Sequence, residues 1–106
     1  MSGKSARTKG FGFERKISQD FQAMGWKDAG RQLEYQANEA HGYDLKNTDP
    51  FLVQCKKHKK YVPIGTIEEI EPQKGKIRLL ITQGDYKEPM AVLSWKDLQT
   101  LICKKK

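Results

Sequence analysis

The sequence has few cysteines and no long apolar run. Its two cysteines, Cys55 and Cys103, belong to no Cys-x-x-Cys or Cys/His spacing, which argues against a disulfide framework or a zinc finger. No stretch approaches the roughly 20 apolar residues that span a bilayer. The charged segment 1–10 is not followed by an apolar signal region. We therefore expect no membrane partner and a cytoplasmic location, in the host cell if the protein is viral.

The chain also lacks an internal repeat, a low-complexity linker and an excess of acidic residues. Its length of 106 residues suits one domain. Twenty Lys and Arg against thirteen Asp and Glu give a formal charge of +7, which favours an anionic partner, nucleic acid first. We predict a flexible basic arm at residues 1–10, for which a frayed terminus is the alternative, and a single domain at residues 11–106.

Three helices are predicted from apolar spacing and capping residues. The first covers residues 12–24 and ends at Gly25; its apolar stripe is Phe13, Ile17, Phe21 and Met24. A short second helix is indicated by apolar residues at steps of three, Ile64, Ile67 and Ile70. Ser94 is expected to cap the last helix, with Asp97 three residues later.

Five strands are predicted between these helices. They cover residues 26–36, where a helix over 32–40 is the alternative, and 43–45, 51–55, 76–82 and 89–93. The turn formers at 47–50 make the second and third strands a candidate hairpin. The order of elements favours an α/β fold with a central mixed sheet of about five strands flanked by helices.

The candidate chemistry lies in residues 42–57. Alternate residues of a strand share a face, so the apolar side chains of 51–55 point one way while Gln54 and Lys56 point the other. A hairpin register that also keeps Tyr43 and Leu45 on the apolar side places Asp44 about opposite Gln54. Three polar groups then converge on one face.

This combination suits hydrolysis of a phosphodiester. A carboxylate and an amide oxygen are hard ligands, which Mg²⁺ or Mn²⁺ prefers. The ammonium group of Lys56 could orient the attacking water and offset charge developing on the phosphate.

These segments resemble a known family. The string KGFGFER at residues 9–15, Gly-Trp at 25–26, Arg31, the Asp44 strand and FLVQCKK at 51–57 are similar to the archaeal-type Holliday junction resolvases and their viral relatives among the PD-(D/E)xK nucleases. The likeness covers residues 9 to about 95. It implies a restriction-endonuclease-like fold and a homodimer that uses Mg²⁺, or Mn²⁺ in its place, to cut four-way DNA junctions symmetrically in recombination and repair.

Carried over by position, the resemblance implies four catalytic residues, Glu14, Asp44, Gln54 and Lys56. It implies a metal held by Glu14, Asp44, Gln54 and the backbone carbonyl of Cys55. Gln54 departs from the usual Asp or Glu, because an amide can ligate through oxygen but carries no negative charge. A non-catalytic branched-DNA-binding protein is therefore the alternative.

Basic residues around this centre are candidates for contacts with DNA phosphates, although each could simply be a solvated surface charge. They are Lys4, Arg7, Lys9, Arg15, Arg31, Lys57, His58, Lys59 and Lys60. An RNA-binding domain is a weaker alternative, because the chain has no RNA-recognition aromatic motif.

Overall fold

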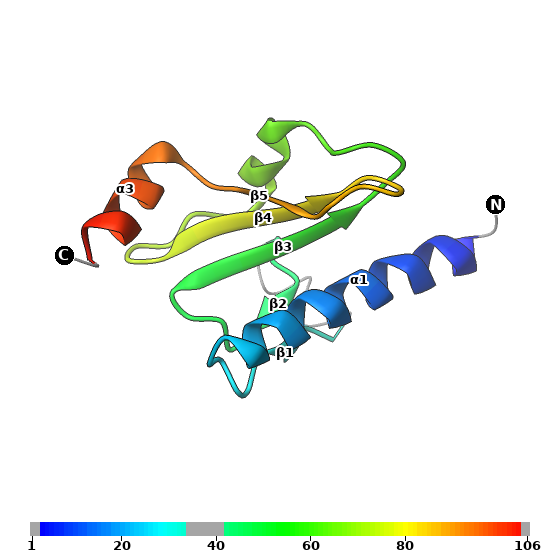
Figure 1. Ribbon diagram of the computed structural model, residues 1–106, viewed down its shortest axis with the longest axis horizontal. Coiled ribbons are helices and arrows are strands. Elements are labelled where there is room, and N and C mark those ends of the chain that lie inside the picture. The colour runs from blue at the N-terminus through cyan, green and yellow to red at the C-terminus, as the bar shows by residue number, and fades with distance from the viewer. Residues whose placement is uncertain (1–2, 34–41, 105–106) are drawn as a thin grey trace.

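The fold is mixed α/β, as a computed structural model shows (Figure 1). The structure describes residues 3–33 and 42–104, with side chains from residue 11 onward. The three longer elements are α1 (Gly3–Ala23), β3 (Phe51–Lys57) and β4 (Ile77–Gln83). The shorter ones are β1 (Gly30–Arg31), β2 (Leu45–Lys46), the 3-10 helix η1 (Ile64–Glu69), β5 (Met90–Val92) and α3 (Trp95–Cys103).

The strands form two sheets among the described residues, rather than the one predicted sheet of about five strands. β1 pairs antiparallel with β2, and the second sheet has the order β3-β4-β5. Within it β3 and β4 are parallel, whereas β4 and β5 are antiparallel. The parallel pair requires a crossover connection, and this connection contains η1. The mixed α/β class is thus confirmed.

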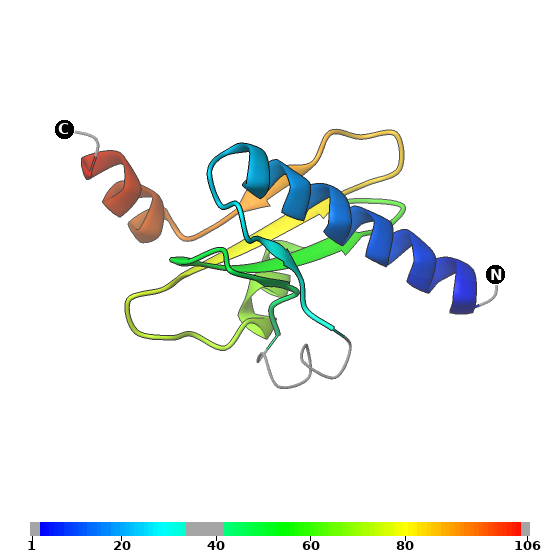
Figure 2. The same ribbon diagram turned by 90° about the horizontal axis from the view of Figure 1, so that it is seen from below.

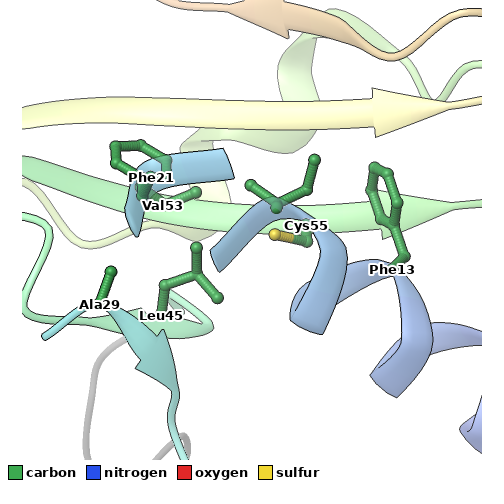
Figure 3. Close-up of a cluster of buried hydrophobic side chains, with 7 residues drawn as sticks. Phe13, Phe21, Ala29, Leu45, Val53 and Cys55 are labelled. Atoms are coloured by element: carbon green, nitrogen blue, oxygen red, sulfur yellow. The ribbon is translucent and has the colours of Figure 1, made fainter. Parts of the chain in front are cut away.

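Helix α1 covers one face of the larger sheet and η1 lies on the other (Figures 1 and 2). The predicted stripe is correct for Phe13, Ile17 and Phe21, which are buried against β2 and β3 beside Val53 (Figure 3). Met24 was also predicted to belong to this stripe, but its side chain is 62% exposed. The reason is that the helix ends at Ala23, before the positive-φ Gly25.

The predicted start of the first helix was too late. Helix α1 begins at Gly3, so residues 3–10, which were assigned to the arm, belong to its backbone. The side chains of Lys4, Arg7 and Lys9 lie outside the described part of the chain, so their contacts stay predictions. The division of the chain into a basic arm and one nuclease domain also stays a prediction.

The remaining elements follow their local sequence signals. The three-residue steps of Ile64, Ile67 and Ile70 match the period of a 3-10 helix, and Ile70 is fully buried. The side chain of Ser94 accepts a hydrogen bond from the Asp97 N–H, as its capping role predicts. No helix in the described ranges is long and apolar enough to cross a membrane.

The predicted strand over 26–36 is reduced to the two residues of β1. Trp26 instead packs edge-on against Phe21 and Phe51 and donates its indole N–H to the Asp49 carbonyl. Of the alternative helix over 32–40, residues 32 and 33 are not helical, and residues 34–40 lie outside the described part of the chain.

Candidate metal and phosphate site

The site lies at the free edge of β3, where the Asp44 segment approaches it. The backbone N–H of Asp44 donates to the Val53 carbonyl at 2.7 Å. Its carboxylate accepts from the Cys55 N–H, also at 2.7 Å. Asp44 therefore brackets Gln54, which is the predicted register. The predicted hairpin ladder is wrong, however, because β2 pairs with β1 and leaves the larger sheet.

The two faces of β3 carry the predicted sets of side chains. Val53 and Cys55 lie in the core beneath α1, as Figure 3 shows. Gln54 and Lys56 lie on the other face, where both contact Glu69 of η1. Gln54 is more buried than expected for a site residue, with 3% of its surface exposed.

Gln54 presents a buried oxygen without a partner. Its amide nitrogen donates to Glu69 Oε1 at 3.0 Å. Because an ionised carboxylate only accepts hydrogen bonds, the nitrogen must face Glu69 and the oxygen must point elsewhere. Within the described part of the chain that oxygen, Gln54 Oε1, accepts no hydrogen bond. A buried acceptor of this kind is costly to leave unpaired, and a cation or an ordered water would satisfy it.

Glu14 and Asp44 lie within electrostatic range of each other although 29 residues separate them in the sequence. Burial raises the pKa of Glu14, and the nearby charge of Asp44 raises it further, against the lowering effect of Arg31 and Lys56. Burial likewise raises the pKa of Asp44, while the Cys55 N–H and the charge of Lys56 oppose this. The charge of Lys56 thus acts on both carboxylates, and the charge of Asp44 acts on Glu14.

Arg31 contacts Glu14 and Phe11. Its Nε lies 3.1 Å from Glu14 Oε1, and its guanidinium stacks 4.2 Å from the ring centre of Phe11. Arg31 thus fixes the Glu14 carboxylate. The contact of this guanidinium with a DNA phosphate stays a prediction.

Glu69 is the member of this cluster that sequence reasoning missed. Its Oε1 binds the Gln54 amide and lies 3.5 Å from Lys56 Nζ, and its charge also raises the pKa of Asp44. Only the crossover between the parallel strands brings η1 to this place, and the sequence gives no local sign of it.

The predicted basic run follows β3 directly. Lys57 is partly buried, and the remaining three residues, His58, Lys59 and Lys60, are exposed. The carbonyl of Lys59 accepts from the Asp85 N–H, and the His58 N–H donates to the Gln83 carbonyl. Arg15 is exposed on α1. The run therefore projects from an anchored turn one residue beyond Lys56.

The donor set fits a hard divalent ion only if Gln54 takes part. No group of three or more His, Cys, Asp or Glu in the described ranges could hold a metal ion. Two carboxylates and the unpaired Gln54 oxygen remain, all oxygen ligands of the type that Mg²⁺ takes. The Cys55 thiol is not a candidate, since burial raises its pKa well above its usual range and it lies in the core.

Comparison with known proteins gave no match. No family model, no curated protein and no solved structure matches this chain. The functional assignment therefore depends on the chain's own residues and on the resemblance of its motifs.

Gly42 holds the Asp44 segment against η1. Its φ is +96°, and a Cβ at this position would collide with the carbonyl oxygen of Glu69. We expect Gly42→Ala to cost roughly 1–3 kcal/mol, which lowers Tm by about 4–8 °C per kcal/mol. Thermal unfolding followed by circular dichroism would measure this. Gly12→Ala, in open space on α1, is the control and should not destabilise. An unchanged Tm for Gly42→Ala would contradict the observed packing.

The two buried carboxylates also predict how stability depends on pH without metal. A carboxyl group whose folded pKa is raised contributes stability that is complete below its unfolded pKa and lost as pH rises through the folded value. In EDTA, Tm of the wild type should therefore fall relative to Asp44→Asn as pH rises from about 4. Adding Mg²⁺ at neutral pH should raise the Tm of the wild type again, because a bound ion stabilises the folded state. A Tm difference that is constant from pH 4 to pH 7.5 would argue against the raised pKa of Asp44.

Proposed function

We propose that this protein is a Mg²⁺-dependent endodeoxyribonuclease that acts on branched DNA, resolving four-way Holliday junctions by paired symmetric cuts as a homodimer. The observation that carries this proposal is the Asp44 carboxylate held on the Cys55 N–H at 2.7 Å, within electrostatic range of Glu14 and Lys56, next along β3 to Gln54 with its buried, unpaired oxygen. The resemblance of residues 9–15 and 51–57 to archaeal-type Holliday junction resolvases supports it.

We further propose that the two sheets correspond to a restriction-endonuclease-like core. The hydrogen bond from the Asp44 N–H to the Val53 carbonyl joins the β2 segment to the edge of β3. In this arrangement the β1-β2 pair extends the β3-β4-β5 sheet on the side where the catalytic groups lie.

Each side chain has a task in this reaction. Glu14, Asp44, the Gln54 oxygen and the Cys55 carbonyl would hold the metal. A bound divalent ion lowers the pKa of water and neutralises charge on a phosphate. Lys56 orients the attacking water and offsets the negative charge that develops on the scissile phosphate. Arg31 keeps the Glu14 carboxylate in place through their 3.1 Å contact.

Basic residues beyond the site would hold the DNA by its phosphates. The exposed side chains of His58, Lys59 and Lys60 continue outward from Lys56, and Arg15 and Lys57 add charge nearby. Contacts of this type recognise the shape and not the sequence of DNA, and their affinity falls steeply with salt.

A two-fold dimer would supply the second cut that a symmetric junction needs. Large apolar side chains are exposed and available for such an interface, among them Ile64 at 73% and Trp95 at 67%. Helix α3, which carries Trp95, has no buried residue and lies at one end of the molecule (Figure 1).

One observation favours a second candidate, a non-catalytic branched-DNA-binding protein. Gln54 carries no charge and its amide is already engaged by Glu69, and the described residues include no three-acid metal cluster. Such a protein would bind junctions equally well with and without Mg²⁺ and would release no product.

The two candidates are separated by incubating the protein with a four-way junction, a nicked duplex and a linear duplex, each with Mg²⁺, with Mn²⁺ and with EDTA. The proposed nuclease produces paired symmetric nicks in the junction only when a metal is present. Junction binding without any metal-dependent product would favour the non-catalytic protein.

A further inference from the structure

Tyr86 lies in the turn between β4 and β5, and its side chain is fully exposed to solvent. The turn covers residues 84–87 and is closed by a 3.1 Å hydrogen bond from the Lys87 N–H to the Gly84 carbonyl. Tyr86 is the third residue of this turn and has a φ of +59°. Positive φ at that place is typical of a type II turn, where glycine or asparagine is usual.

Neither burial nor backbone geometry accounts for a tyrosine at this position. The left-handed region disfavours a bulky side chain, so the residue costs stability. An exposed ring gains nothing from the core in return. A residue that is held in a disfavoured conformation and presents a large flat group to solvent points to a ligand for that group.

The turn that carries Tyr86 is packed against the basic run that follows β3. The Asp85 N–H donates to the Lys59 carbonyl at 3.1 Å. A Cβ on Gly84 would lie 3.3 Å from both the Lys59 carbonyl oxygen and Lys60 Cα. The two loops therefore form one anchored surface, at the end of the sheet where β3 and β4 both end (Figure 1).

This surface is basic around the exposed ring. Its two loops carry four lysines against two acids; the lysines are Lys57, Lys59, Lys60 and Lys87, and the acids are Asp85 and Glu88. Cations attract the phosphates of a nucleic acid, and an aromatic ring stacks on any base because every base has a π-face. The pairing of lysines with an exposed aromatic side chain is therefore suited to DNA whose bases are not fully stacked.

The ring is also close to the proposed reaction centre. Thr82 pairs with Lys56 in the parallel register of β3 and β4. Tyr86 follows Thr82 by four residues, which extend over at most about 14 Å. Along one DNA strand this distance corresponds to about four nucleotides. One face of the protein can thus hold a base near the branch together with the phosphate to be cut.

We propose that the Tyr86 ring stacks on an unstacked base at the branch point of the DNA, while the neighbouring lysines contact the adjoining phosphates. This inference rests on the proposed nuclease function and names the feature of branched DNA that the protein selects. In a linear duplex each base is covered on both faces by its neighbours, and uncovering a face costs unstacking energy. At a branch point the stacking is already interrupted, so the ring favours the branched substrate.

The test compares the affinity of the intact protein for a four-way junction and for a linear duplex, in EDTA so that no strand is cut. Tyr86→Gly removes the ring and suits the positive φ, so its Tm should equal or exceed that of the wild type. It should bind the junction between roughly 5- and 150-fold more weakly, the loss of one stacked base, and bind the linear duplex as before. Tyr86→Phe is the matched control, because it keeps the ring and should bind both DNAs like the wild type.

Photocrosslinking to 5-iododeoxyuridine placed at the branch point reads the contact directly, with the crosslinked residue identified by mass spectrometry. The wild type should crosslink through Tyr86 at the branch and should not do so when the same base lies within an arm. Crosslinks at other residues only would overturn the proposal. A Tyr86→Gly variant that changes its oligomeric state but keeps its junction affinity would also overturn it, in favour of a contact between proteins.

The outcomes separate this inference from the proposed function. If the wild type cuts junctions and Tyr86→Gly binds them equally well, only the stacking role fails. If the wild type cuts no DNA but crosslinks through Tyr86 at the branch, the stacking role holds and the nuclease proposal fails. A wild type that binds a junction no more tightly than a linear duplex would overturn both.

Discussion

Replacing Asp44 by Asn is expected to reduce junction cleavage about 10³-fold or more, the effect of losing several kcal/mol of transition-state stabilisation. The substitution keeps the size of the side chain, and its amide oxygen can still accept the hydrogen bond from the Cys55 N–H. What it removes is the negative charge beside Glu14. Single-turnover cleavage of a labelled four-way junction at saturating Mg²⁺ would measure the loss.

The matched control for this change is Asp28→Asn, which removes the same charge from an exposed position before β1. It should leave the cleavage rate within about twofold, since exposed distant charges are largely screened. Junction binding by Asp44→Asn should be retained, because binding depends on the basic residues. If the Asp44→Asn variant still cleaved junctions at the wild-type rate, the Asp44 carboxylate would have no part in the reaction.

Replacing Lys56 by Met is expected to lower the cleavage rate by roughly 10²–10³-fold while junction affinity changes little. Met keeps an apolar stem of similar length, so the packing at the end of β3 should persist. The ammonium beside Asp44 and Glu69 is lost. The rate at saturating junction and Mg²⁺ isolates the chemical step from binding.

Lys57→Met provides the comparison for Lys56, because adjacent residues of β3 point to opposite faces. Lys57 is a proposed phosphate contact, so its loss should weaken binding and reduce the dependence of affinity on salt. The rate at saturating DNA should remain. If the two variants behave alike, Lys56 contributes to binding and has no specific part in the chemistry.

The sequence predicts those parts of the fold that depend on local patterns. The stripe of Phe13, Ile17 and Phe21, the Ser94 cap and the alternation along β3 all follow from spacing of residues within one element, and the structure confirms them. The register of Asp44 against Gln54 is also correct. It follows from the requirement that Leu45, which is fully buried, point toward the core.

Features that depend on distant pairing could not be predicted in the same way. The apolar pattern of residues 43–46 shows that they are extended but does not show whether β1 or β3 is their partner, and β1 is the one observed. The position of Glu69 depends on β3 and β4 being parallel. Arg31 reads as a surface cation in the sequence, and only the path of α1 places it against Glu14.

The most direct test of the cation site is a crystal structure of the protein grown with Mn²⁺, with the ion located by its anomalous scattering. We expect one peak contacting carboxylate oxygens of Asp44 and Glu14 and the amide oxygen of Gln54, at about 2.0–2.4 Å as for other oxygen-bound divalent ions. The absence of any peak there at saturating Mn²⁺, with a water filling the place beside Gln54 Oε1, would contradict the account.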